Sequence, residues 1–133
     1  MLLSEILPRM RYETPYRIEG ERAFEALALC VSNLSKDSLI FLDSEEYLCE
    51  LRPNVRMVLT NESLSARLLE KGVGVCVSRE PRVLFFLLHN FLSSQPEYTR
   101  ARFQTRIGRD CAISPLSCVA AENVPIGDRV VIE

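Results

Sequence analysis

Apolar runs of strand length alternate with segments of helical period along the first hundred residues. Continuous apolar runs predict buried strands at residues 38–42, 55–60 and 74–77. A segment of helical character follows each run. This order predicts crossover connections over a small sheet that is mostly parallel or mixed, because parallel strands need such connections. The expected fold class is therefore α/β.

Local signals mark the ends of the first two predicted helices. The first covers residues 45–51, and Asp43 or Ser44 is suited to cap its N-terminus. The second follows Asn61, another residue suited to an N-cap, and stops at Gly72, which we expect to end the helix as a C-terminal glycine.

The third predicted helix starts at Pro81, a residue suited to the first helical position. Apolar residues run almost all round it between 83 and 92, so we expect it to be largely buried. His89, the only histidine of the chain, lies on this helix. Nothing beside it in the sequence suggests an orienting carboxylate, and a half-buried structural histidine is the commoner case.

Two short segments near the N-terminus are harder to interpret. Residues 17–20 fit an edge strand, whereas residues 26–29 fit either a strand or a helix, and periodicity does not decide between them. Residues 93–97 have the composition of a linker. We therefore predict an α/β domain over residues 1–105 and a different structure over residues 106–133.

The pattern changes to a period of six after residue 106. Aliphatic residues recur in frame at Ile107, Ile113, Val119, Ile126 and Ile132. Short side chains follow three of these aliphatic residues at a distance of four positions, namely Cys111, Ser117 and Val130. This spacing is typical of a hexapeptide parallel β-helix, with an ordinary β-rich tail as the alternative. Three hexads make one triangular coil, so we expect the chain to be the front part of a longer protein that continues beyond Glu133.

Composition excludes several classes of protein. The chain has 133 residues, of which 47% are hydrophobic and 26% are charged, so neither a disordered chain nor a collagen is expected. Sixteen basic residues nearly balance eighteen acidic ones, which argues against nucleic-acid binding. The longest apolar run is far too short to span a membrane, and the N-terminus lacks the features of a signal peptide. We expect a cytoplasmic protein.

The cysteines indicate neither a disulfide framework nor a zinc site. They are five in number, widely spaced and without a C-x-x-C pair. We expect reduced, mostly buried residues that act as small apolar side chains, and no metal site.

The segment between Phe41 and Tyr47 stands at a predicted strand-to-helix turn. Two aromatic rings six residues apart could face each other across this turn and hold a flat ring, or could simply belong to the core. Together with the order of α/β domain, buried helix, linker and hexads, the segment resembles UDP-3-O-acylglucosamine N-acyltransferase. Phe41 and Tyr47 match the two aromatic residues that hold the uracil ring in that family. Ser44 stands where the family has the asparagine that binds uracil, and Glu45 and Glu46 replace its proline and lysine.

The resemblance implies a bacterial enzyme of lipid A and lipopolysaccharide synthesis. Its α/β domain would bind a UDP-linked glucosamine derivative, and the hexads would begin a left-handed β-helix. The sugar amine would attack an acyl thioester on acyl carrier protein, with no cofactor. The family's catalytic histidine lies on later coils, so no catalytic residue is assigned to this chain. The full-length family is a homotrimer, and we expect this chain to be a monomer or weak dimer.

Two further interpretations remain open. One is a hexapeptide acetyltransferase that uses acetyl-CoA and acts on another nucleotide sugar or on a polysaccharide precursor. The other is a non-catalytic interaction module that has lost its ligand.

Overall fold

The computed structural model describes residues 1–10, 12–32, 35–96, 98 and 101–133. The chain forms two compact units, Met1–Tyr98 and Thr99–Glu133. In the described part of the chain, no helix is both long enough and apolar enough to cross a membrane.

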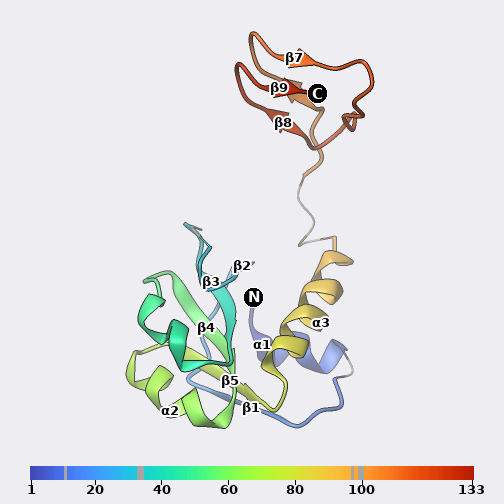
Figure 1. The fold of residues 1–133 in the computed structure, drawn as a ribbon. Coiled ribbons are helices and arrows are strands. Elements are labelled where there is room, and N and C mark those ends of the chain that lie inside the picture. The colour runs from blue at the N-terminus through green and yellow to red at the C-terminus, as the bar shows by residue number, and fades with distance from the viewer. Residues whose placement is uncertain (11, 33–34, 97, 99–100) are drawn as a thin grey trace. The chain divides into compact units, whose positions relative to one another are not determined.

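A five-stranded sheet in the order β1-β5-β4-β3-β2 forms the centre of the N-terminal unit (Figure 1). Its strands are β1 (Tyr16–Glu19), β2 (Ala26–Leu27), β3 (Ser38–Leu42), β4 (Val55–Thr60) and β5 (Gly74–Ser78). The strands β2 to β5 are parallel, and β1 pairs antiparallel with β5 at the edge. The predicted α/β class and the mixed sheet are therefore confirmed.

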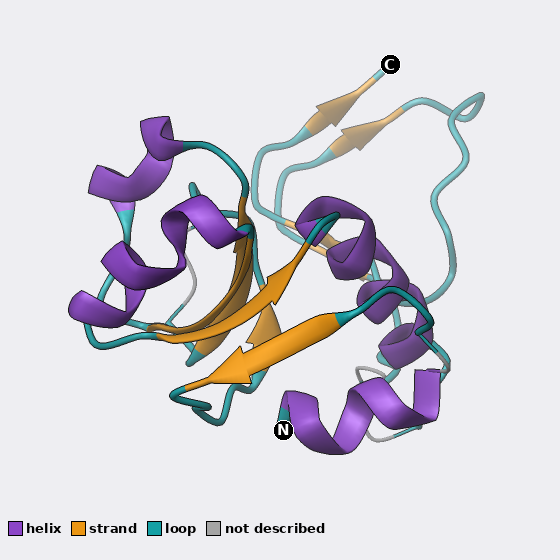
Figure 2. Cartoon of the chain, turned by 90° about the horizontal axis from the view of Figure 1, so that it is seen from below, coloured by secondary structure: helices purple, strands orange, loops and turns teal. Residues whose placement is uncertain are grey.

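Helices cover both faces of this sheet (Figures 1 and 2). One face carries the 3-10 helix η2 (Glu45–Glu50) and α2 (Glu62–Glu70), and the other carries α1 (Leu3–Ile6), the 3-10 helix η1 (Leu7–Met10) and α3 (Pro81–Ser93). Because successive side chains of a strand point to opposite faces, Leu39 and Ile40 enter different apolar cores. The result is a three-layer unit with a core on each side of the sheet.

The local predictions near the sheet are mostly confirmed. The edge strand at 17–20 is β1, and residues 26–27 form a strand rather than a helix. Gly72 ends α2 in the left-handed conformation with φ +78°, where a glycine has no steric penalty. Asn61 stands at the N-cap position of α2 as predicted, but its side chain makes no capping hydrogen bond and donates instead to the carbonyl of Asp43 at 3.2 Å.

The prediction that the third helix is largely buried is also wrong. The helix α3 packs on the sheet through one side only, where Leu84 and Leu88 are fully buried. The opposite side leaves Val83 and Phe86 about half exposed, at 48% and 51%. His89 lies on this exposed side instead of being half-buried.

The cysteines differ from the expectation of mostly buried residues. Only Cys76, on β5, is buried among the five, whereas Cys49 and Cys118 are exposed. The sheet interior therefore accommodates one thiol, and the others lie on loops or short elements where no second layer covers them. Burial, with a smaller contribution from the carboxylate of Glu21, raises the pKa of the Cys76 thiol to about 12.

The C-terminal unit is built from two short parallel strand pairs. Its strands are β6 (Arg106–Ile107), β7 (Ala112–Ile113), β8 (Pro125–Ile126) and β9 (Val131–Ile132). Ile107 pairs with Ile126, and Ile113 pairs with Ile132. Each pair is separated by 19 residues, which is three hexads plus one inserted residue. This register is the one that stacking of successive coils in a parallel solenoid requires.

The aliphatic residues of the hexads are only partly covered. Ile113 and Ile132 are of intermediate burial and Ile107 is exposed, and none of the described residues of this unit is fully buried. A stack of two strand pairs has too few layers to enclose a core. That the pairs belong to a left-handed β-helix stays a prediction.

We expect Cys76 to make folding stability depend on alkaline pH. An unfolded thiol ionises above its ordinary pKa of 9.0, whereas the buried thiol keeps its proton until about 12. The stabilising contribution is complete below pH 9 and declines as pH rises from 9 to 12, by up to about 1.4 kcal/mol for each pH unit. Urea unfolding under reducing conditions should show a steeper decline for the wild type than for Cys76→Ala. Parallel slopes would contradict this assignment.

We expect Gly108→Ala to disturb the stacking of the C-terminal unit. A Cβ atom at Gly108 would lie 2.5 Å from the carbonyl carbon and oxygen of Gly127, whereas a Cβ atom at Gly127 would meet nothing within 4 Å. The amide of Ala112 donates to the carbonyl of Val130 at 3.0 Å and reports on the stack. Gly108→Ala should accelerate its hydrogen exchange about tenfold or more. Gly127→Ala is the matched control, and an equal effect of both variants would refute the steric explanation.

Candidate functional site

The carboxyl ends of the parallel strands form one edge of the N-terminal sheet. Ala28 follows β2, Asp43 follows β3, Asn61 follows β4 and Arg79 follows β5. In open α/β sheets ligands bind at this edge, where loops from neighbouring strands converge. Two pockets lie along it.

The smaller pocket, of about 230 Å³, contains two of the three predicted ligand-binding residues. Its lining is mostly apolar and consists of Leu29, Cys30, Val31, Phe41, Leu42, Asp43, Tyr47 and Arg82. The fold thus brings Phe41 and Tyr47 to one cavity. We call this cavity the aromatic pocket.

Ser44, the third predicted residue, is not among the residues that line the aromatic pocket. Its hydroxyl accepts a hydrogen bond from the backbone N–H of Glu46 at 3.4 Å and so caps η2. The local sequence explains this role, because serine at a strand-to-helix turn satisfies one of the free N–H groups of the first turn. A ligand contact of Ser44 stays a prediction.

Phe41 lines the aromatic pocket and packs against two aromatic rings of α3. It is partly buried, and its ring centroid lies 5.1 Å from that of Phe85 and 6.2 Å from that of Phe86, both on α3. The guanidinium carbon of Arg82 lies over the ring, 5.4 Å from its centroid. Packing on α3 therefore holds the ring of Phe41 in place, and the long, flexible side chain of Arg82 covers it.

Tyr47, the second aromatic residue that lines the pocket, is more exposed than Phe41. The residue is 40% exposed and lies in η2. The thiol of Cys30 donates to its carbonyl oxygen at 3.7 Å, which joins the loop after β2 to η2. An exposed aromatic ring beside an apolar cavity is free to stack on a flat ligand.

One ion pair forms the polar end of the aromatic pocket. The Nε atom of Arg82 lies 3.3 Å from Oδ2 of Asp43. Asn61 holds the backbone of the same aspartate, because its amide group donates to the carbonyl of Asp43. Sequence reasoning considered Asp43 only as a helix cap and missed Arg82, for which the local sequence carries no signal.

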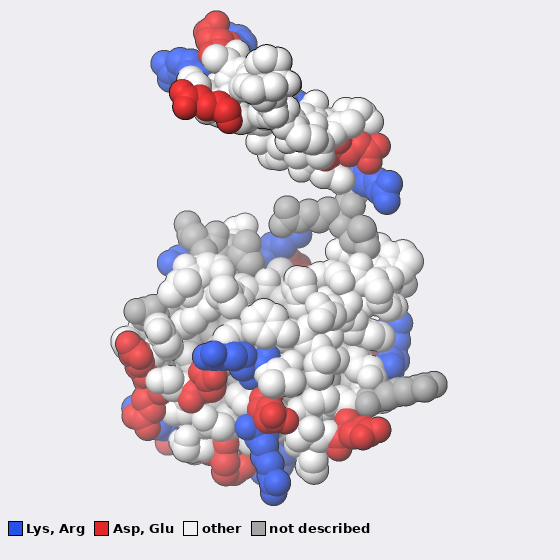
Figure 3. All heavy atoms as spheres, turned by 45° about the vertical axis from the view of Figure 1, so that its right-hand side comes forward, with Lys and Arg blue, Asp and Glu red and all other residues white. Residues whose placement is uncertain are grey.

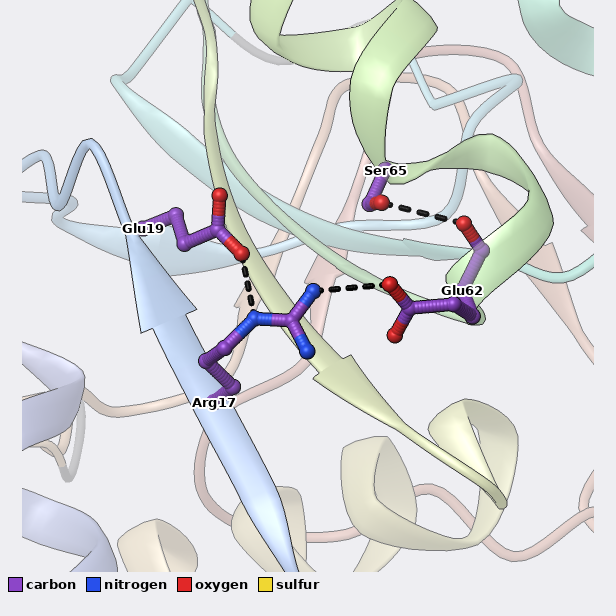
Figure 4. Close-up of polar contacts among 4 residues, drawn as sticks. All are labelled: Arg17, Glu19, Glu62 and Ser65. Carbon is purple, nitrogen blue, oxygen red and sulfur yellow. Dashed lines mark hydrogen bonds and ion pairs between the residues drawn. The ribbon is translucent and has the colours of Figure 1, made fainter.

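The larger pocket, of about 520 Å³, lies farther along the same edge. It is lined by Pro15, Tyr16, Arg17, Asn61, Glu62, Val77, Ser78 and Arg79. Figure 4 shows the guanidinium of Arg17 between Glu19 and Glu62, with 2.9 Å to Glu62. The hydrogen bond from Arg17 lowers the pKa of the Glu62 carboxyl, and the two carboxylates raise the pKa of Arg17. An anionic ligand would have to displace two carboxylates from Arg17, so this pocket is the weaker candidate.

The face of the N-terminal unit drawn in Figure 3 has no general preference for one sign of charge. Red and blue side chains alternate along the lower part of the N-terminal unit, with a broad uncharged area above them. With 16 basic and 18 acidic residues in the chain, ligand selection depends on individual side chains more than on a long-range field.

Comparisons with known proteins do not add to this description. A scan against protein-family models, a search of curated proteins and a search of solved structures each found no significant match. Across the described ranges, no group of three or more His, Cys, Asp or Glu residues is arranged to hold a metal ion.

We expect Phe41→Ala and Tyr47→Ala to differ in their effect on stability. Loss of the Phe41 ring removes its contacts with Phe85 and Phe86 and should lower the free energy of unfolding by about 2 kcal/mol or more. Tyr47 is 40% exposed, so its truncation should cost less than that of Phe41, about 1 kcal/mol. Urea denaturation of both variants measures the difference. A larger loss at Tyr47 would show that its ring belongs to the core.

Proposed function

We propose that the N-terminal unit binds the pyrimidine nucleotide end of a nucleotide-linked sugar in the aromatic pocket. The observation that carries the proposal is that Phe41 and Tyr47, which lie on different elements, line one apolar cavity. UDP is the nucleotide that the resemblance to UDP-3-O-acylglucosamine N-acyltransferase implies. The proposal therefore joins a sequence resemblance to a pocket of suitable chemistry.

The aromatic pocket suits a flat ring better than a flexible chain. Phe41 and Tyr47 offer π-faces, and Leu29 and Val31 add apolar surface from the loop after β2. Stacking on aromatic side chains favours nucleobases in general, because every base has a π-face. The ion pair of Asp43 and Arg82 offers a hydrogen-bond acceptor and several donors beside the apolar walls.

In the proposed enzyme this chain recognises and orients the substrate. The amine of the bound sugar would attack the carbonyl carbon of an acyl thioester on acyl carrier protein. The new amide C–N bond forms as the C–S bond breaks, and the amine proton passes to a base. We assign no residue of this chain to that base. We further propose that the pairs β6–β8 and β7–β9 begin a left-handed β-helix, on the support of their register of 19 residues.

Ser44 stands where the family has asparagine, and this difference favours the alternative that the chain binds a different sugar nucleotide from the one that the family uses. Its hydroxyl serves η2, so no side-chain amide reads the base at this position. A hexapeptide acetyltransferase acting on another nucleotide sugar would have the same aromatic pocket. Titration with UDP and CDP tests the base selectivity of the site, since an equal affinity for both would show that it does not distinguish uracil from cytosine.

We expect Tyr47→Ala to weaken UDP binding by about 1–3 kcal/mol, the usual contribution of one aromatic ring that stacks on a base. Isothermal titration of the full chain with UDP measures the change. Tyr16→Ala is the matched control, because Tyr16 is comparably exposed at 36% but lines the larger pocket. Its UDP affinity should equal that of the wild type.

Three results would count against the proposal. An equal loss in Tyr16→Ala and Tyr47→Ala would remove the reason to place the base in the aromatic pocket. A loss in Tyr16→Ala alone would move the site to the larger pocket. No binding of UDP or CDP at millimolar concentration to the folded wild type would favour a non-catalytic interaction module.

A further inference from the structure

Arg82 stands where the aromatic pocket meets the carboxyl edge of the sheet. It is the second residue of α3, and its side chain is 64% exposed. The guanidinium lies over Phe41 and against Asp43, and both of these residues line the pocket. The side chain therefore covers one of the two rings that a base would use.

The contacts that hold Arg82 in this place are weak ones. A solvated cation–π contact and a solvated ion pair each contribute little to stability. A base that stacks on Phe41 would take the position of the guanidinium, and the exposed arginine side chain can move without disturbing the core.

Arg82 is also suited to bind a phosphate group. Among the described residues that line the aromatic pocket, it is the only one with a positive charge. Its ion pair with Asp43 is made through Nε at 3.3 Å, which leaves the two terminal nitrogens to face a ligand. The planar guanidinium presents these donors in a fork that matches two phosphate oxygens.

We propose that Arg82 covers Phe41 in the free protein and, once the base has taken its place, binds the phosphate groups of the nucleotide. This assignment rests on the proposed function, since it presumes that a nucleotide occupies the aromatic pocket. Arg82 is then a specificity-determining residue that selects a phosphorylated ligand over a nucleoside.

The test compares uridine with UDP on the full chain, because the two ligands share a base and differ in phosphate. The wild type should bind UDP more tightly than uridine by about tenfold or more, as expected for charge-assisted hydrogen bonds. Arg82→Gln should remove most of this difference. It should leave the affinity for uridine unchanged or slightly higher, because the ring of Phe41 is then uncovered.

Arg79→Gln is the matched control, since Arg79 is an arginine of the same sheet edge that lines the larger pocket. It should keep the wild-type preference for UDP. Added salt should weaken UDP binding more than uridine binding in the wild type, because only UDP is charged. Inorganic pyrophosphate alone should bind much more weakly than UDP, and thermal melting should show that both variants are folded.

The possible outcomes separate this inference from the function on which it rests. If neither uridine nor UDP binds the folded wild type, the proposed function fails and the role of Arg82 fails with it. If the wild type binds both ligands equally, or if Arg82→Gln weakens both equally, the nucleotide site stands and the role of Arg82 is wrong. An equal effect of Arg79→Gln, or pyrophosphate binding as tight as that of UDP, would also overturn it.

Discussion

The parallel pairing of β3, β4 and β5 is the constraint on which the rest of the N-terminal unit depends. These strands are buried on both faces, so nearly every side chain along them must be apolar and must find a core. Because successive side chains of each strand point to opposite faces of the sheet, they form two cores. One core lies under η2 and α2, and the other lies under α1, η1 and α3. Because the strands run in the same direction, the same pairing collects their carboxyl ends at one edge.

The candidate site is a consequence of that edge. Each polar or aromatic residue of the aromatic pocket comes from the end of a strand or from the element that follows it, and packing elsewhere determines its position. Phe41 is fixed by α3, whereas Tyr47 is carried by η2, which Ser44 caps. The most adaptable member is Arg82, whose side chain is 64% exposed. A rigid ring beside a movable cation is an arrangement suited to binding a ligand that carries both an aromatic group and a negative charge.

The C-terminal unit follows a different principle. Its structure is built by repetition, because residues of one hexad stack on residues three hexads later in the chain. The backbones of stacked segments come close together where glycine permits it. The backbone of Gly127 approaches Gly108 at a distance that a side chain would prevent. Three residues with positive φ turn the chain between its straight segments, namely Asp110, Asn123 and Arg129. Stability in such a unit grows with the number of stacked layers, which explains why its aliphatic residues are only partly covered.

The sequence by itself determined the strands at residues 38–42, 55–60 and 74–77, the helix stop at Gly72 and the period of the hexads, since each depends on local periodicity or backbone preference. It also contained a signal that was missed, because the spacing of Leu3, Ile6 and Leu7 fits the helical N-terminus. Only the tertiary structure decided which side of α3 stays exposed. It also decided that the side chain of Asn61, at the N-cap position of α2, donates to the Asp43 carbonyl instead of to its own helix. The contacts of Arg82 with Phe41 and Asp43 likewise depend on the tertiary structure alone. Local patterns record the period of an element, whereas contacts between distant residues depend on which faces the topology covers.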